Sequence, residues 1–236
     1  MLFVLLIIAL ALCIIAMLYW LLMSPWSQVC GRVHVRLTTS EKIVALTFDD
    51  GPNDPYTTQL LDILAAEQVR VTFFVVGENA ANNPAVIQRM HAEGHIVGNH
   101  SLSHQFSLYF RDRFFRSQID ATQDIVKRII GVAPLYYRSP WLFRTPWLLR
   151  TVRERGLVPV WGVFGSEREI AQGDPKKIAD RAFKKVRPGT ILIFHDGFDN
   201  HGGFRGSTVA AIALLIPELK KAGYRFVTVD ALQDKH

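Results

Sequence analysis

The chain has 236 residues, of which 49% are hydrophobic and 20% charged, and its formal net charge is +6. Its two cysteines, Cys13 inside an apolar segment and Cys30 just beyond it, exclude a disulfide framework. The positive charge points to an anionic surface or substrate. Nucleic acid is not an expected partner because no known binding module is visible, and no protein partner is indicated.

The first 23 residues form an uncharged apolar segment, MLFVLLIIALALCIIAMLYWLLM. A helix of about 20 apolar residues spans the roughly 30 Å hydrocarbon layer of a membrane, and Tyr19, Trp20 and Trp26 suit its interface. A cleaved signal peptide would have a basic start, a shorter apolar core and small residues before the cut, and none of these is clear. We therefore expect a single-pass anchor over residues 1–23, in contact with lipid of a bacterial-type inner membrane.

The charges beyond the anchor predict which side of the membrane the rest of the chain occupies. The anchor has no basic side chain, whereas Arg32, Arg36 and Lys42 lie within about 20 residues of its end. The positive-inside rule therefore predicts that the C-terminal domain is cytoplasmic, although a lone N-terminal anchor often exports the domain attached to it. We expect a juxtamembrane linker over residues 24–41 and one folded domain over residues 42–236.

Short apolar runs alternate with helical patterns along this domain. Helices are expected over residues 57–68, 83–94, 174–186 and 207–223, with Pro217 kinking or splitting the last one. Strands are expected over residues 43–48, 71–76, 95–98, 135–138, 157–161, 190–194 and 224–229. Such alternation predicts an α/β fold with a parallel sheet or barrel. Seven strands instead of eight predict a distorted or incomplete barrel.

Chemically active side chains come directly after several of the expected strands, where a (β/α) barrel places its active site. Asp49 and Asp50 come after the first strand, and His100 and His104 after the third. The spacing of the histidines would put both imidazoles on one side of a helical turn. Such a pair alone is weak evidence, but two histidines and a carboxylate from another strand end form a common site for zinc or a similar metal.

Four segments, TFDDGP, HSLSH, RSPW and ILIFHDG, occur in this order and at suitable spacing. They closely resemble the signature motifs of the polysaccharide deacetylase family, also called the NodB-homology domain or carbohydrate esterase family 4. The resemblance covers residues 42–231. It implies a distorted (β/α)7 barrel and the metal-dependent removal of N-acetyl or O-acetyl groups from glycans.

The resemblance also implies roles for the first motifs. Asp50, His100 and His104 would hold a divalent metal, with zinc the first expectation and cobalt or nickel compatible with the same ligands. Asp49 would be the general base, oriented by Arg138. This division suits the physics of adjacent carboxylates, because a cation neutralises one and an arginine can keep the other ionised.

The remaining motifs imply an acid and a substrate groove. His195 would protonate the departing amine, and Pro140 and Trp141 would shape the groove. The fourth motif departs from the family, since Phe164 stands where an aspartate that supports the catalytic histidine is expected. Glu167 is the nearest acidic replacement, so we expect it beside His195.

Three further features bear on the substrate. Arg205 could bind an anionic group, although an exposed loop arginine is the commoner case. Residues 107–116 and 135–150 combine aromatic and basic side chains. Ordinary helix and barrel packing explains such stretches, and a lipid-facing rim around the site is the alternative.

These observations predict a membrane-anchored, metal-dependent amino-sugar N-deacetylase. Its substrate would be an N-acetylated glycan, such as peptidoglycan or a chitin-like oligomer, or a lipid-linked sugar carried on a polyprenyl phosphate. Two alternatives remain open at this point: a deformylase or other C–N amide hydrolase of the same fold, and a glycan-binding relative without activity.

Overall fold

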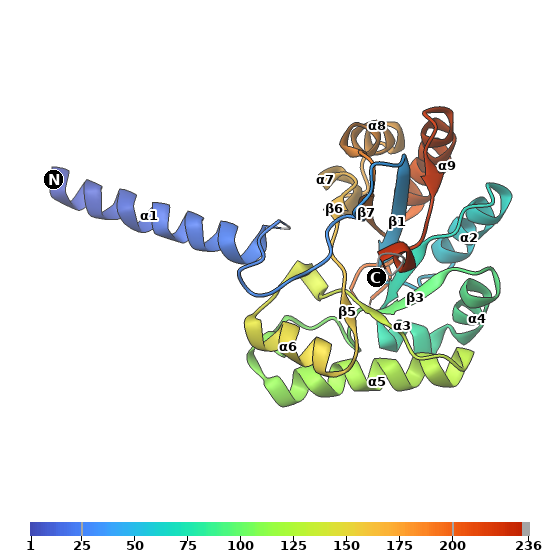
Figure 1. Ribbon diagram of the computed structural model, residues 1–236, viewed down its shortest axis with the longest axis horizontal. Coiled ribbons are helices and arrows are strands. Elements are labelled where there is room, and N and C mark those ends of the chain that lie inside the picture. Colours follow the sequence, from blue (N-terminus) through green and yellow to red (C-terminus); the bar gives the residue numbers. More distant parts are fainter. Residues whose placement is uncertain (25, 200, 233–236) are drawn as a thin grey trace.

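The computed structural model describes residues 1–24, 26–199 and 201–232. Helix α1 (Leu2–Met23) projects away from a domain that contains all the other elements (Figure 1). Residues Leu2–Leu21 have a mean hydropathy of 3.1, and none of that span is buried. By length and composition α1 could cross a membrane, and a signal sequence would meet the same criteria.

The domain is built on one curled sheet of eight strands. Its order is β5-β4-β3-β2-β1-β7-β6, and β8 pairs with β1. Every pairing between these strands is parallel. The strands are β1 (Ile43–Asp49), β2 (Thr72–Val75), β3 (Ile96–Asn99), β4 (Tyr136–Tyr137), β5 (Val158–Pro159), β6 (Val163–Phe164), β7 (Thr190–His195) and β8 (Arg225–Phe226).

The predicted distorted (β/α)7 barrel is confirmed. Each of the seven expected strands overlaps a strand of the structure, and β6 is the strand that the sequence did not predict. It has two residues and begins four residues after β5 ends, so it leaves no pattern of its own in the sequence. Strand β1 is buried along its whole length, which explains its mostly apolar sequence.

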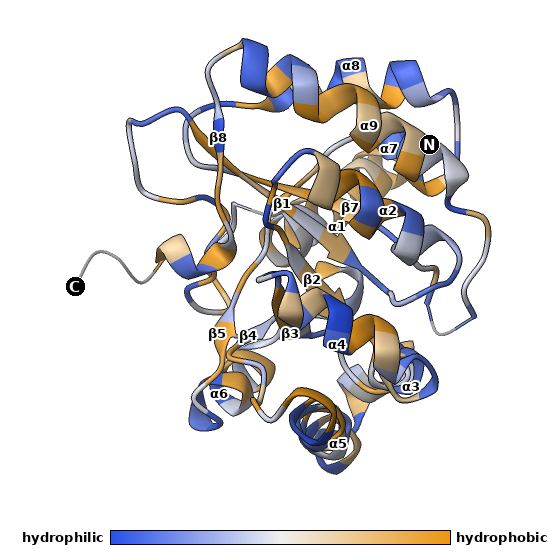
Figure 2. Ribbon diagram, turned by 90° about the vertical axis from the view of Figure 1, so that its right-hand side faces the viewer, coloured by the Kyte–Doolittle hydropathy of each residue, from blue (hydrophilic) through white to orange (hydrophobic). Residues whose placement is uncertain are grey.

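Helices cover the outside of the sheet (Figure 1). In Figure 2 the outer helices, α5 among them, carry both hydrophilic and hydrophobic residues, as expected of elements that cover a sheet. In the domain they are α2 (Tyr56–Ala66), α3 (Gly77–Asn82), α4 (Pro84–Ala92), α5 (Asp112–Ile130), α6 (Pro146–Glu154), α7 (Glu167–Ile170), α8 (Pro175–Lys185) and α9 (Gly206–Lys221), with short 3-10 turns η1 (Phe106–Phe110), η2 (Pro140–Leu142) and η3 (Val229–Leu232).

The proline in α9 was expected to kink or split the helix, and it does not split it. Helix α9 runs from Gly206 to Lys221 with Pro217 inside it. Proline removes one backbone hydrogen bond, which leaves the carbonyl four residues earlier, that of Ala213, without its donor. Both Pro217 and Ala213 lie on the exposed side of the helix. Water can therefore bond to that carbonyl, and the helix continues.

Part of the expected linker is packed into the barrel. His34 forms a parallel bridge with Val160, and Arg36 forms an antiparallel bridge with Thr190. The segment thus joins the β5 edge of the sheet to the start of β7, next to the other edge. Its side chains Cys30, Val33, Val35 and Leu37 are buried.

Candidate active site

The expected active-site residues gather at the C-terminal ends of the parallel strands. Asp49 ends β1 and His195 ends β7, while His100 directly follows β3. A cavity of about 280 Å³ opens there, and its wall includes these three side chains together with Asp50 and His104. The parallel sheet therefore brings together residues that are far apart in the sequence.

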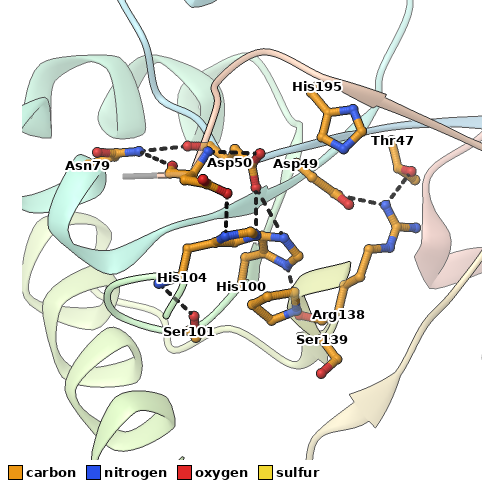
Figure 3. Close-up of polar contacts among 12 residues, drawn as sticks. Thr47, Asp49, Asp50, Asn79, His100, Ser101, His104, Arg138, Ser139 and His195 are labelled. Carbon is orange, nitrogen blue, oxygen red and sulfur yellow. Dashed lines mark hydrogen bonds and ion pairs between the residues drawn. The ribbon is translucent and has the colours of Figure 1, made fainter. Parts of the chain in front are cut away.

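Asp50, His100 and His104 form a compact set of potential metal ligands (Figure 3). The Nε2 atoms of His100 and His104 lie 3.3 and 3.2 Å from Asp50 Oδ1. One ligand atom from each residue lies within 4.8 Å of the others, and all three residues are buried. Asp50 Oδ1 is buried and has no hydrogen-bond partner. A buried, unpartnered carboxylate oxygen facing two imidazole nitrogens fits a shared divalent cation.

The pKa of Asp50 reflects these neighbours. Burial alone would raise it, but the close contact with His100 and the charges of His104, His195 and His100 outweigh burial and lower it well below its usual range. The carboxylate is therefore held in the ionised form that metal binding requires.

The histidines of this set do not lie on a helical turn, so that expectation is wrong. The residues from His100 to His104 form an irregular loop in which Ser101 and His104 have φ values of 69° and 51°. Asn99 Oδ1 accepts a hydrogen bond from Ser101 N at 2.9 Å, and Ser101 Oγ accepts one from His104 N at 3.2 Å. These local bonds shape the loop so that both imidazoles reach Asp50.

The second ring nitrogens of both histidines have fixed neighbours. His100 Nδ1 lies 2.8 Å from the carbonyl oxygen of Arg138, and His104 Nδ1 lies 2.7 Å from Asp199 Oδ1. The backbone N–H of Asp199 also donates to Asp50 Oδ2 at 3.1 Å. Such contacts orient metal-binding side chains. The role of Asp199 was not predicted from the sequence, where the only sign of it is an acidic residue two positions after the HDG motif.

Arg138 is fully buried and holds Asp49 in place. Its Nη1 donates to Asp49 Oδ1 and to Thr47 Oγ1, each at 2.7 Å (Figure 3). Its Nη2 donates to the carbonyl of Trp161 at 3.1 Å, and its guanidinium carbon lies 4.1 Å from the centroid of the Phe74 ring. These contacts leave Arg138 one orientation, so it can fix the direction of the Asp49 carboxylate.

His195 is supported by Glu169, and the expected partner Glu167 is wrong. Glu169 is 1% exposed, and its Oε2 lies 2.8 Å from His195 Nδ1. Its Oε1 accepts hydrogen bonds from His195 N at 3.1 Å and from Thr208 Oγ1 at 2.6 Å. Glu167 is exposed and pairs with Lys185 at 2.5 Å. Residues two apart on a helix point about 200° apart, so in α7 the inward carboxylate is Glu169.

The pair formed by His195 and the buried Glu169 is ionised. Burial would lower the pKa of His195, but the charge and hydrogen bond of Glu169, with the charges of Asp50 and Asp49, raise it to about 9. Burial would likewise raise the pKa of Glu169, but His195 and the hydrogen bond from Thr208 lower it. The imidazole thus carries a proton near neutral pH and can act as a proton donor.

The residues expected to contact substrate occupy different positions. Trp141 is 42% exposed on the cavity wall, with its ring centroid 4.3 Å from that of His104. Pro140 is buried, and its carbonyl accepts a hydrogen bond from the Tyr109 hydroxyl at 2.6 Å, so it supports the rim from below. Arg205 is 2% exposed and lines the cavity, which excludes an exposed loop arginine at this position.

The glycine of the TFDDGP motif has a steric role. A Cβ atom on Gly51 would lie 1.9 Å from Asp196 Oδ2, so any other residue would displace that side chain. Asp196 accepts a hydrogen bond from Thr57 Oγ1 at 2.6 Å, and burial raises its pKa to about 7. The first and last motifs are therefore in direct contact beneath the cavity.

The chain matches proteins that remove acetyl groups from glycans. The sequence profile described as Polysaccharide deacetylase matches residues 36–160, more than half of the chain. A peptidoglycan-N-acetylglucosamine deacetylase of Bacillus cereus is 35% identical over 87% of this chain and 95% of its own length. A chitooligosaccharide deacetylase of Sinorhizobium fredii is 36% identical over 82% of this chain and 93% of its own length.

A solved structure shows the same fold. The crystal structure of the Bc1960 peptidoglycan N-acetylglucosamine deacetylase superimposes with a TM-score of 0.79 at 31% sequence identity. The similarity covers 85% of this chain and 92% of that one. The barrel fold is thus shared with this deacetylase.

Proposed function

The chain belongs to the polysaccharide deacetylase family, and from this premise we propose that it is a metal-dependent hydrolase that removes the N-acetyl group from an amino sugar of a glycan. One observation carries the proposal. A single cavity contains the buried Asp50, His100 and His104 set, with Asp49 and His195 beside it. These are the groups that amide hydrolysis needs: a place for a Lewis acid, a base and an acid.

The ligand set would hold the metal ion that acts as the Lewis acid. Asp50, His100 and His104 would hold a divalent cation, with zinc the first expectation and cobalt or nickel compatible with the same donors. When bound, the cation supplies polarisation of the acetyl carbonyl and a lower pKa for the attacking water. The contacts of His100 and His104 through their second ring nitrogens keep the ligands oriented toward one point.

Asp49 and His195 would divide the proton transfers. The Asp49 carboxylate takes the proton of the attacking water, and Arg138 holds it in position through the 2.7 Å ion pair. His195 gives its proton to the amine as the C–N bond breaks. Since Glu169 occupies Nδ1, the proton that His195 delivers is the one on Nε2.

Mass spectrometry of defined glycans tests the proposal. Metal-loaded protein should release acetate from chitin oligomers or from peptidoglycan fragments, and the product should lose the mass of one acetyl group. The same oligomers with N-formyl groups separate a deacetylase from a deformylase. A protein that binds these glycans and holds metal but releases neither group would be the binding relative instead. The complete set of ligands, base and acid favours an enzyme.

The support of His195 by Glu169 gives a testable pH dependence. In the Glu169→Gln variant the pKa of His195 should fall from about 9 toward its ordinary value of 6.5. The proton donor is then lost at lower pH, so the alkaline limb of the kcat/KM profile should shift to lower pH and the rate at pH 8 should drop by about 30-fold. The raised pKa of His195 also stabilises the folded protein. By linkage this contribution is fully present below about pH 6.5 and is lost as the pH rises through about 9. The Glu169→Gln variant should therefore be less stable than the unmodified protein at neutral and acidic pH.

Glu167→Gln is the matched control, because Glu167 lies two residues away on the same helix and pairs with Lys185 at the surface. Its pH profile should coincide with that of the unmodified enzyme. Equal shifts in the two variants, or none in Glu169→Gln, would contradict the assignment.

We propose further that α1 anchors the enzyme in a bacterial inner membrane with the domain on the cytoplasmic side. The basic residues Arg32, Arg36 and Lys42 beyond α1 support this orientation. Lipid-linked sugars made at the inner leaflet would then be the accessible substrates. A C-terminal reporter fusion decides the question. An extracytoplasmic signal would overturn this orientation and make wall or secreted polysaccharide the better substrate, in line with the peptidoglycan deacetylase of B. cereus.

A further inference from the structure

Arg205 is a buried cation on the wall of the active-site cavity. It precedes α9, and only 2% of its surface is exposed. Its Nη1 donates to the carbonyl of Ile170 at 3.3 Å, and its guanidinium lies 5.1 Å from the centroid of the Phe198 ring. Both neighbours are also on the cavity wall. The side chain is therefore held against the cavity by weak, uncharged contacts.

Its hydrogen-bonding capacity is not used up. Arg205 Nε is buried without a hydrogen-bond partner, and among the described residues no carboxylate forms an ion pair with the guanidinium. Burying a charged group without a counter-charge is costly. Arginine carries five N–H donors in a planar fork that matches carboxylate and phosphate groups. An arginine in a cavity that has an unused donor and no ion pair is thus a site that a ligand can complete.

The other charges around the described part of the cavity are matched. Asp49 pairs with Arg138, and Glu169 pairs with His195. The carboxylate of Asp50 belongs to the metal-ligand set, and Asp199 Oδ1, also on the wall, lies 2.7 Å from His104 Nδ1. Arg205 is the single arginine or lysine side chain on this described cavity wall, and it forms no ion pair with a described carboxylate.

We propose that Arg205 forms a subsite for an anionic group of the substrate, a carboxylate or a phosphate adjacent to the acetylated sugar. The proposal rests on the proposed function, because the same cavity must take the sugar. It divides glycans into two classes: neutral chitin-like chains leave Arg205 unpaired, and glycans with an acidic neighbour pair with it. Arg205 would then select acidic glycans by binding.

Four probes separate the charge from the rest of the glycan. The first two are a chitin tetramer and the same tetramer bearing a 1-phosphate. The other two are an oligomer of alternating N-acetylglucosamine and N-acetylmuramic acid, and the same oligomer with each carboxylate converted to a methylamide. Within each pair, kcat/KM for the acidic member divided by kcat/KM for the neutral member measures how much the anionic group contributes to substrate recognition. The carboxylate pair and the phosphate pair identify which source of the anion is preferred.

The unmodified enzyme should prefer the acidic member of at least one pair by about 10- to 100-fold, mainly through a lower KM, and less so at high salt. Arg205→Gln should bring that ratio close to one, and Arg205→Lys should restore part of it. Arg128→Gln, at an exposed position on α5, should keep the full ratio. Thermal melting of each variant shows whether it is folded.

Arg205 has a second electrostatic effect, and the experiment must distinguish it from binding of an anionic group. Its charge is one of several that lower the pKa of Glu169. If that were its only role, Arg205→Gln would lower the rate on acidic and neutral probes alike and would leave their ratio unchanged. Ratios near one in the unmodified enzyme would also overturn the proposal. Release of acetyl groups from none of the four probes would instead reject the proposed deacetylase function.

Discussion

Alanine at Asp50, His100 or His104 is expected to abolish metal binding and deacetylation together. Each residue supplies one of the three ligand atoms that lie within 4.8 Å of one another. Two remaining ligands hold a divalent ion poorly, and the electrophile is lost with the ion. We expect the rate of acetate release to fall by at least about 10³-fold. Elemental analysis of the purified variants, beside activity, measures both effects.

His91→Ala is the matched control for these variants. His91 is an exposed histidine on α4, so its loss should leave metal content and activity unchanged. Chelation gives a second readout. A bound ion stabilises the folded state by mass action, so a chelator should lower the melting temperature of the unmodified protein but not that of the three variants. Stoichiometric metal in all three would refute the ligand set. Reconstitution of the metal-free protein with zinc, cobalt or nickel identifies the most active ion.

Asp49→Asn is expected to separate catalysis from metal binding. An asparagine keeps the size of the side chain and can still accept the hydrogen bond from Arg138, but it cannot take a proton from water. We therefore expect full metal content with a loss of turnover of about 10²- to 10⁴-fold. His195→Ala should likewise keep the metal and lose turnover, because His195 is outside the ligand set.

The control for this prediction is Asp54→Asn. Asp54 lies five residues after Asp49 in the sequence. It is exposed and accepts a hydrogen bond from Thr58. The same chemical change there should leave turnover unaffected. Near-normal turnover of Asp49→Asn, with its metal retained, would exclude Asp49 as the base.

The sequence predicted the parts of the site that depend on strand ends. An apolar run as strong as the one before Asp49 must be buried, and parallel strands bring their C-terminal ends to one side. The gathering of Asp49, Asp50, His100 and His195 results from that alone. The irregular loop before His104 could not be predicted, because a spacing of four residues fits a helical turn equally well.

The side-chain partners beyond the motifs were harder to predict. Choosing between Glu167 and Glu169 requires the orientation of a single helical turn, and α7 is only four residues long. Asp199 and the burial of Arg205 depend on how the chain after β7 folds back over the cavity. Hydrophobic periodicity carries no information about such polar segments, so their contacts appear only in the folded structure.

The pairing of residues 30–37 with the barrel limits the distance between α1 and the domain that contains the catalytic cavity. A free linker over residues 24–41 could extend about 60 Å. With the segment from Cys30 onward fixed in the domain, the stretch that remains could extend only about 20 Å. Arg144 further donates a hydrogen bond to the carbonyl of Ser24. With α1 as the proposed anchor, the enzyme would have a short reach, and its glycan would have to be delivered to the membrane surface that α1 occupies.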